Sequence, residues 1–181
     1  MRNQSLRELY VAELKDIYNA EQQLVNTLPK LAKASSSDEL RQAFENHLEE
    51  TRSQVARLET IFEMMEQSPK GKKCVGMEGL VKEGAAMIEE FNDSLLDAGL
   101  ISAAQRVEHY EMAGYGSAIA YAELLGNAKA ASLLRESLAE EKQADQTLTE
   151  LSTVINADAN TGVANAKPSQ RTGRKRAKRA A

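Results

Sequence analysis

Four glutamates of this chain lie on or beside stripes of apolar residues, where acidic side chains are unusual. Glu21 is three residues before Leu24 on the first such stripe, and Glu111 and Glu141 have similar apolar neighbours on later segments. Glu50 lies at the edge of its stripe. Carboxylates inside a protein cost several kcal/mol each unless they protonate, pair with cations or bind metal. We therefore predict that the four glutamates hold metal ions.

The distance of each glutamate from its nearest predicted turn places all four at one depth. Glu21 lies 13 residues before the turn that follows it, and Glu50 lies 12 residues after the start of the next helix. The corresponding separations are 14 residues for Glu111 and 13 for Glu141. A helix rises about 1.5 Å per residue, so each glutamate lies roughly 18–20 Å from its turn. One glutamate per helix at one level predicts a shared site, although any single glutamate can instead rotate to the surface.

Three further residues are candidate metal ligands because they lie one helical turn from these glutamates. His47 is three residues before Glu50. Glu108 is three residues before Glu111, and Asp145 is four residues after Glu141. Residues at i and i+3 share a helix face and can ligate one ion. The alternative for His47 is a core histidine bonded to a carboxylate, and His109 is expected to face outward.

Apolar periodicity at three- and four-residue intervals predicts that nearly all of residues 4–154 are helical. The stretch 68–79, which contains Pro69 and Gly71, interrupts the pattern, and so does Asp97-Ala98-Gly99. Two helical hairpins joined by a long connection with its own short helix predict an all-α fold, an antiparallel four-helix bundle with a crossover. The expected helices are 4–33, 38–67, 80–96, 100–125 and 128–154.

The formal net charge of −4 averages two unlike parts of the chain. Residues 157–181 hold seven Lys and Arg against one acid, whereas the rest holds 16 basic and 26 acidic residues, a charge of −10. We predict a helical domain over 1–156 and a basic, disordered tail over 157–181, since the tail has few apolar residues to bury. A nucleic acid is a candidate partner for the tail's basic residues, Lys167, Arg171, Arg174, Lys175, Arg176, Lys178 and Arg179.

Composition argues against several other classes of protein. With only eight aromatic residues and no Trp, the chain is unlike proteins that bind single strands by stacking bases on aromatic side chains. The single Cys74 excludes an internal disulfide framework and a cysteine-rich metal site. No apolar run is long enough for a membrane span, and the first residues lack the apolar core of an export signal. These features predict a cytoplasmic protein without a membrane partner.

Five blocks in order resemble the YciF-like stress proteins, a branch of the ferritin-like superfamily. They are ELKDIYNAEQQL (13–24), AFENHLEET (43–51), CVGMEGL (74–80), QRVEHYEMAGYG (105–116) and ESLAEEKQAD (136–145), within a match over about 4–155. The resemblance implies a ferritin-like bundle, a homodimer, stress-linked expression in bacteria and a di-metal centre. Carried over by position, that centre falls on Glu21, Glu50, Glu111 and Glu141.

The chain departs from ferritins and rubrerythrins, which generally carry Glu-x-x-His on two bundle helices. Ser53 stands three residues after Glu50, and Ala144 stands three residues after Glu141. Fewer imidazoles and more carboxylates make a harder ligand set, which suits Mn as well as Fe. The expected cofactor is therefore two ions of Fe or Mn per subunit.

These observations predict a stress protein with a carboxylate-rich di-metal centre that acts on peroxide or oxidises Fe(II). Such a protein would be a non-haem catalase, peroxidase or ferroxidase, and the sequence leaves these reactions open. The alternative is a metal-poor structural bundle, or a DNA-associated stress protein that uses its basic tail. Storage of metal inside a large shell is a lesser option, because nothing in the sequence indicates contacts that would build a cage.

Overall fold

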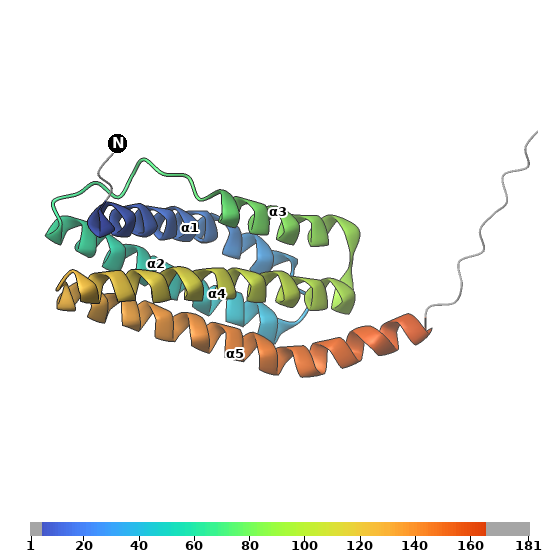
Figure 1. Ribbon diagram of the computed structural model, residues 1–181. Coiled ribbons are helices and arrows are strands. Elements are labelled where there is room, and N and C mark those ends of the chain that lie inside the picture. The colour runs from blue at the N-terminus through green and yellow to red at the C-terminus, as the bar shows by residue number, and fades with distance from the viewer. Residues whose placement is uncertain (1–4, 166–181) are drawn as a thin grey trace, which may run out of the picture.

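The computed structural model describes residues 5–165, and every regular element in this range is an α-helix (Figure 1). The helices are α1 (Leu6–Ala34), α2 (Asp38–Met64), α3 (Val75–Glu90), α4 (Asp93–Leu124) and α5 (Ala128–Asn165). No helix in this range is both long and apolar enough to cross a membrane. The prediction of an all-α fold is confirmed.

Four of the helices form an antiparallel bundle, and α3 lies outside it. Hairpin α1–α2 packs beside hairpin α4–α5, with α1 against α4 and α2 against α5 (Figure 1). Because the connection over residues 65–74 and α3 together lead back along the bundle, α2 and α4 run in the same direction. This is the predicted ferritin-like arrangement with a crossover that contains an extra helix.

Local sequence signals explain where the first hairpin begins and turns. Ser5 caps α1 by accepting a hydrogen bond from the backbone N–H of Glu8, whose side chain accepts one from Ser5 in return. Ser37 caps α2 in the same way with the N–H of Leu40. Asp97 of α4 then accepts from the backbone N–H groups of Ser36, at 2.9 Å, and Ser37, at 2.8 Å. These bonds hold the α1–α2 turn against the second hairpin.

The crossover differs from the sequence prediction in its boundaries. Helix α3 begins at Val75 rather than near 80, and the break before α4 falls at residues 91–92, so Asp97-Ala98-Gly99 lies inside α4. Cys74 provides the early start, because its thiol accepts from the N–H of Met77 as the N-cap of α3. Gly99 lets two helices approach closely, since a Cβ there would lie 3.2 Å from Met87 Sδ. The glycine serves helix packing and does not break the helix.

Helix α5 extends past its predicted end at 154 and past the domain boundary at 156. It continues to Asn165 and projects beyond the ends of the other helices (Figure 1). Residues 155–165 contain no proline, and Ile155 and Ala159 are still buried. The first part of the predicted tail, 157–165, is thus helical. The rest of that tail, with all seven basic residues, lies outside the described residues.

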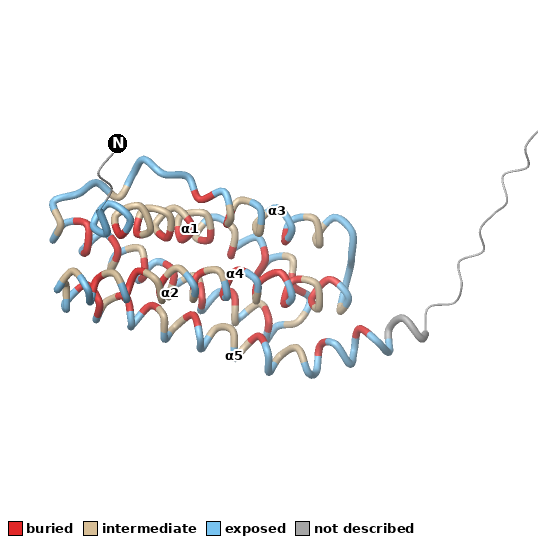
Figure 2. The backbone as a smooth tube through the Cα atoms, in the orientation of Figure 1, coloured by how far each residue is buried: buried red, intermediate tan, exposed pale blue. Residues whose placement is uncertain are grey.

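Buried residues recur along all four bundle helices (Figure 2), and they form two apolar clusters with a polar layer between them. On α1 the buried residues of the first cluster begin at Ala20, and those of the second end at Ile17. The other bundle helices divide in the same way: on α4 the two clusters are separated by the stretch between Val107 and Tyr115. Between the clusters each helix contributes buried polar side chains to the layer: Glu21, His47, Thr51, Gln54, Glu108, Glu111 and Glu141.

A hydrogen-bonded group fastens the start of α3 to the bundle. Tyr110 of α4 donates to Asp16 Oδ2 at 2.6 Å, and the Cys74 thiol lies 3.0 Å from the same oxygen and 3.0 Å from the Tyr110 hydroxyl. Lys72 pairs with the other oxygen of Asp16 at 3.1 Å. Because the three residues around Asp16 come from the crossover and α4, the group fixes the crossover against α1.

Candidate metal centre

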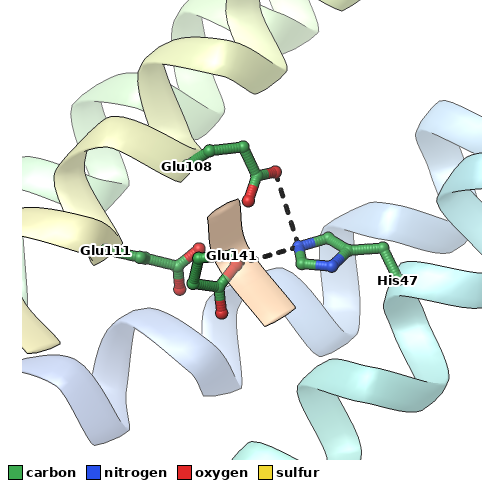
Figure 3. A group of neighbouring side chains, drawn as sticks. All are labelled: His47, Glu108, Glu111 and Glu141. Atoms are coloured by element: carbon green, nitrogen blue, oxygen red, sulfur yellow. Dashed lines mark ion pairs between the residues drawn. The ribbon is translucent and has the colours of Figure 1, made fainter. Parts of the chain in front are cut away.

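The polar layer brings together the side chains that suit a metal ion. Ligand atoms of His47, Glu108, Glu111 and Glu141 all lie within 4.8 Å of one another (Figure 3). They come from three helices, α2, α4 and α5, and all four residues are buried. Glu108 and Glu111 are one helical turn apart, so both point from α4 into the layer.

His47 connects the interior of the layer with its edge. Its Nε2 lies 3.4 Å from Glu108 Oε1 and 3.7 Å from Glu141 Oε2, and its Nδ1 lies 3.3 Å from Glu50 Oε2. A carboxylate that accepts a hydrogen bond from one ring nitrogen orients the imidazole and leaves the other nitrogen free to bind metal. The geometry therefore suits His47 as a ligand through Nε2.

Two neutral side chains hold carboxylates of the layer in place. Tyr115 donates a hydrogen bond to Glu21 Oε1, and Gln54 donates one to Glu141 Oε1 at 2.5 Å. Each of these bonds uses one carboxylate oxygen, and the other oxygen of both Glu21 and Glu141 is buried with no hydrogen-bond partner. The free oxygens are the ones available to a cation.

The charged forms of these acids are disfavoured without a cation. Burial, reinforced by neighbouring carboxylates, raises the pKa of Glu21 and Glu111 well above the ordinary glutamate value. Burial also raises the pKa of Glu141, against the effect of His47, and raises the pKa of Glu108 to about 8. For His47, burial lowers the pKa, but the hydrogen bond with Glu50 and the nearby carboxylates outweigh it and leave the pKa raised. The layer thus binds protons when it has no other cation.

No positively charged side chain in the range 5–165 forms an ion pair with Glu21, Glu108, Glu111 or Glu141, apart from His47 when it is protonated. Arg57 instead forms a bidentate pair with the partly exposed Glu140, at 2.7 and 2.5 Å. The structural alternative, in which Lys and Arg neutralise the inner acids, therefore has no support from these residues.

All but one of the buried polar side-chain atoms without a hydrogen-bond partner in the described chain lie in this layer, the exception being the Tyr10 hydroxyl. Both oxygens of Glu111 and one oxygen of Glu108 are buried without a hydrogen-bond partner, as are His47 Nε2 and Gln54 Oε1. Buried polar atoms are normally satisfied, so a group of orphaned acceptors indicates an ion or water that occupies the space between them. Carboxylate oxygens with one imidazole nitrogen match the ligand set of Fe and Mn sites in helical bundles, so these residues fit the implied metal.

The structure buries five of the seven predicted site residues in the polar layer and leaves the other two outside it. It brings Glu111, Glu141, His47 and Glu108 together, and it buries Glu21 in the same layer. Glu50 contacts only the outer nitrogen of His47, and its side chain is 41% exposed. The seventh candidate, Asp145, lies outside the buried group, where it pairs with the exposed His109 at 3.5 Å and accepts a hydrogen bond from Gln105 at 3.2 Å.

Gln54 and Tyr115 are functional candidates that sequence reasoning missed. A signal was present for Gln54, because His47, Thr51, Gln54 and Leu58 follow one another at spacings of four, three and four residues and so share one face of α2. That spacing places Gln54, rather than Glu50, on the inner face.

The fold and the buried carboxylates define a ferritin-like helical bundle, and comparison with known proteins agrees. A family model described as a domain of unknown function, DUF892, matches residues 5–160. Protein YciF of Escherichia coli (strain K12) is 46% identical over 153 residues, which cover 83% of this chain and 92% of YciF. The chain therefore belongs to the DUF892 family, and the predicted resemblance to YciF-like proteins is confirmed.

Solved structures support the same assignment. The crystal structure of the E. coli stress protein YciF has a TM-score of 0.82 at 44% identity, covering 87% of this chain and 99% of that one. YcfI from Rhodopseudomonas palustris has a TM-score of 0.79 at 41% identity, covering 82% and 96%. A Xanthomonas campestris protein at 23% identity, with a TM-score of 0.70, covers 88% and 98% and shows the fold alone.

Proposed function

We propose that this protein is a cytoplasmic stress protein of bacteria whose buried polar layer binds two ions of Fe or Mn and acts on peroxide or Fe(II). The observation that carries the proposal is the group of buried carboxylate oxygens without hydrogen-bond partners, chiefly those of Glu21, Glu108, Glu111 and Glu141. Four such acids beside one histidine have too few cationic partners in the described chain to remain charged unless a metal is bound.

The number of donors supports two ions rather than one. Glu108, Glu111, Glu141 and His47 converge within 4.8 Å and suffice for a first ion. Glu21 has a free buried oxygen in the same layer. Together with Glu111 and Glu141, it would hold a second ion. Carboxylates that bridge two metals are the usual ligands of di-iron and di-manganese bundles.

Two redox-active ions would supply the two electrons that reduce peroxide, or would pass electrons from Fe(II) to peroxide or dioxygen as the oxidant. The chain itself contributes positioning, proton handling and protection from solvent. Tyr115 and Gln54 orient Glu21 and Glu141, and the apolar clusters on either side of the layer limit the access of water. Glu108, whose pKa burial raises to about 8, can take up or release a proton near neutral pH when it is not held by a metal.

Elemental analysis of protein purified from metal-replete cells tests the proposal. We expect about two equivalents of Fe or Mn, lost on treatment with a chelator, and a fall in melting temperature once the metal is removed. The variants E141A and E111Q should lose the metal, whereas E45Q, at an exposed position on α2, should keep it. Protein that contains no Fe or Mn, or whose melting temperature does not change when a chelator is added, would instead establish the metal-poor structural bundle.

Binding of nucleic acid through the basic residues between Lys167 and Arg179 is a second proposed function, which the charge of the chain favours. The part of the chain before residue 157 carries a net charge of −10, so contact with a polyanion would depend on the tail.

We further propose that the protein is a homodimer.

A further inference from the structure

A cavity of about 120 Å³ lies between α2 and α5 and reaches the polar layer. His47 of α2 and Glu108 of α4 line its buried end, Glu50 of α2 lines its exposed end, and Ala43 and Ala144 line it from the two facing helices. The cavity therefore touches two of the four side chains that converge on the candidate metal position, His47 and Glu108.

Exposure changes steeply along this cavity. The Glu50 side chain is 41% exposed, whereas the side chains of His47 and Glu108 are 7% and 3% exposed. His47 contacts Glu50 through one ring nitrogen and Glu108 through the other, at 3.3 and 3.4 Å. A polar path thus leads from solvent at Glu50 to the buried carboxylates.

The size and charge of the cavity limit what it can admit. An apolar cavity of about 150 Å³ in another protein binds benzene, so a space of 120 Å³ suits a molecule no larger than a single small ring. Its lining contains Glu50 and Glu108 and neither Lys nor Arg. The lining consequently favours cations and neutral polar molecules over anions.

The opposite side of the layer offers much less space. A second cavity between α1, α3 and α4 also reaches His47 and Glu108, but its volume is about 20 Å³ and most of its lining is apolar. Leu24, Leu28 and Val107 are among the side chains that close it. A hydrated cation would have to lose its water among these side chains, which is costly.

We propose that the cavity between α2 and α5 is the entrance to the metal centre, and that Ala43 and Ala144 set its width. This inference rests on the proposed metal binding. Divalent cations pass Glu50 and His47 on their way inward, and small neutral donors bind in the space beside Ala144. Larger molecules are excluded because α2 and α5 leave no room for them.

The rate of cobalt uptake tests the entrance. Co(II) added to metal-free protein is followed by visible absorbance in a stopped-flow instrument, and the final stoichiometry is measured separately. We expect A144L and A43L to take up Co(II) at least tenfold more slowly than the wild type, to the same final stoichiometry. The control A139L, at an exposed position of the same helix as Ala144, should keep the wild-type rate.

Two outcomes separate the entrance from the metal site itself. Co(II) uptake at the wild-type rate in both A144L and A43L would overturn the proposed entrance and leave the proposed metal binding intact. A wild type that binds no Co(II) would overturn both. Circular dichroism reports whether each variant folds, and A43L carries the test alone if A144L does not fold.

The binding of small ligands gives an independent test of the size limit. Imidazole, added to the cobalt protein, should change the visible spectrum, whereas 1-benzylimidazole should not, because its ring system exceeds the cavity. A144L should lose the response to imidazole, and A139L should keep it. Equal responses to the two ligands would contradict the proposed width.

Discussion

Glu111 illustrates what the buried layer demands of a single residue. Both of its carboxylate oxygens are buried without a hydrogen-bond partner, and burial together with Glu21 and Glu141 raises its pKa well above the ordinary value. A side chain in this environment destabilises the metal-free fold. Residues that are kept at a cost to stability are typical of functional sites.

Replacement of Glu111 should therefore stabilise the metal-free protein while it destroys the site. We expect E111Q to raise the free energy of unfolding of chelator-treated protein by about 1–3 kcal/mol, because an acidic group without partners is removed. Urea denaturation measures the change, and E45Q serves as the exposed control. A less stable E111Q protein would contradict this view of the layer.

The stability of the metal-free protein should fall as the pH rises. Glu108 has a pKa of about 8 in the folded protein against an ordinary value of 4.5, so between these values the folded state binds more protons than the unfolded state. The stabilisation by this proton is complete below about pH 4.5 and is lost as the pH rises through 8. Denaturation midpoints of chelator-treated protein from pH 5 to 8 measure the trend.

Metal affinity should show the opposite dependence on pH, because the ligand carboxylates must lose their protons before they bind. The variant E108Q should have a shallower pH dependence of metal-free stability than the wild type. A wild-type stability that stays constant between pH 5 and 8 would show that the acids of the layer are not protonated in the folded state.

At the scale of elements, the bundle depends on how closely α3 approaches α4. Gly76, in the first turn of α3, lies under the ring of Tyr110, and a Cβ built there would be 2.7 Å from Tyr110 Cε2. The same ring donates through its hydroxyl to Asp16. The glycine thus permits the contact that fastens the crossover to both hairpins.

Substitution of this glycine should loosen the crossover. We expect G76A to lower the free energy of unfolding by about 1–3 kcal/mol, because the Tyr110 ring must move away from its hydrogen bonds. The matched control is G79A on the same helix, where a Cβ meets nothing within 4 Å and should stabilise the helix by up to about 1 kcal/mol. Thermal denaturation compares the two variants, and equal effects would contradict the packing argument.

At the scale of the whole molecule, acidic and basic residues are separated along the chain. The region before residue 157 has a net charge of −10 and the remainder has +6. The acidity is partly internal, in the layer between the two apolar clusters. Helix α5 projects past the ends of the other helices before the basic residues begin along the chain.

Removal of the tail should abolish binding to DNA. In a gel shift, we expect the full chain to retard duplex DNA in a manner that weakens steeply with salt, because each basic residue that contacts a phosphate releases a counterion. A truncation to residues 1–166 should leave the DNA unshifted. Equal shifts by the two proteins would remove the tail as the binding element.

The predicted homodimer is tested by sedimentation. We expect the full chain to sediment with twice the mass of one chain at micromolar concentration and to show no further assembly into a shell. A single-chain mass would contradict the dimer. A large closed assembly would instead support storage of metal inside a shell.

The sequence by itself determined the helices, their inward faces and the depth of the acidic layer. Apolar periodicity and the caps at Ser5 and Ser37 are local features, and the rise per residue is the same in every helix, so Glu21, Glu111 and Glu141 were placed at one level correctly. The boundaries of the crossover were harder to predict from the sequence, because Gly99 continues a helix where Met87 packs against it.

The tertiary structure decided which residues of α2 point into the layer. Glu50 and Gln54 are one turn apart, about 6 Å along the axis and about 40° around it, and the rotation of α2 about its axis decides which of them faces the layer. That rotation is fixed by how Leu40, Phe44 and Leu58 pack against the other helices; the local spacing indicates the inner face, but it does not decide whether Glu50, at the edge of that face, enters the layer. Packing therefore buried His47 and Gln54 and left Glu50 at the mouth of the cavity.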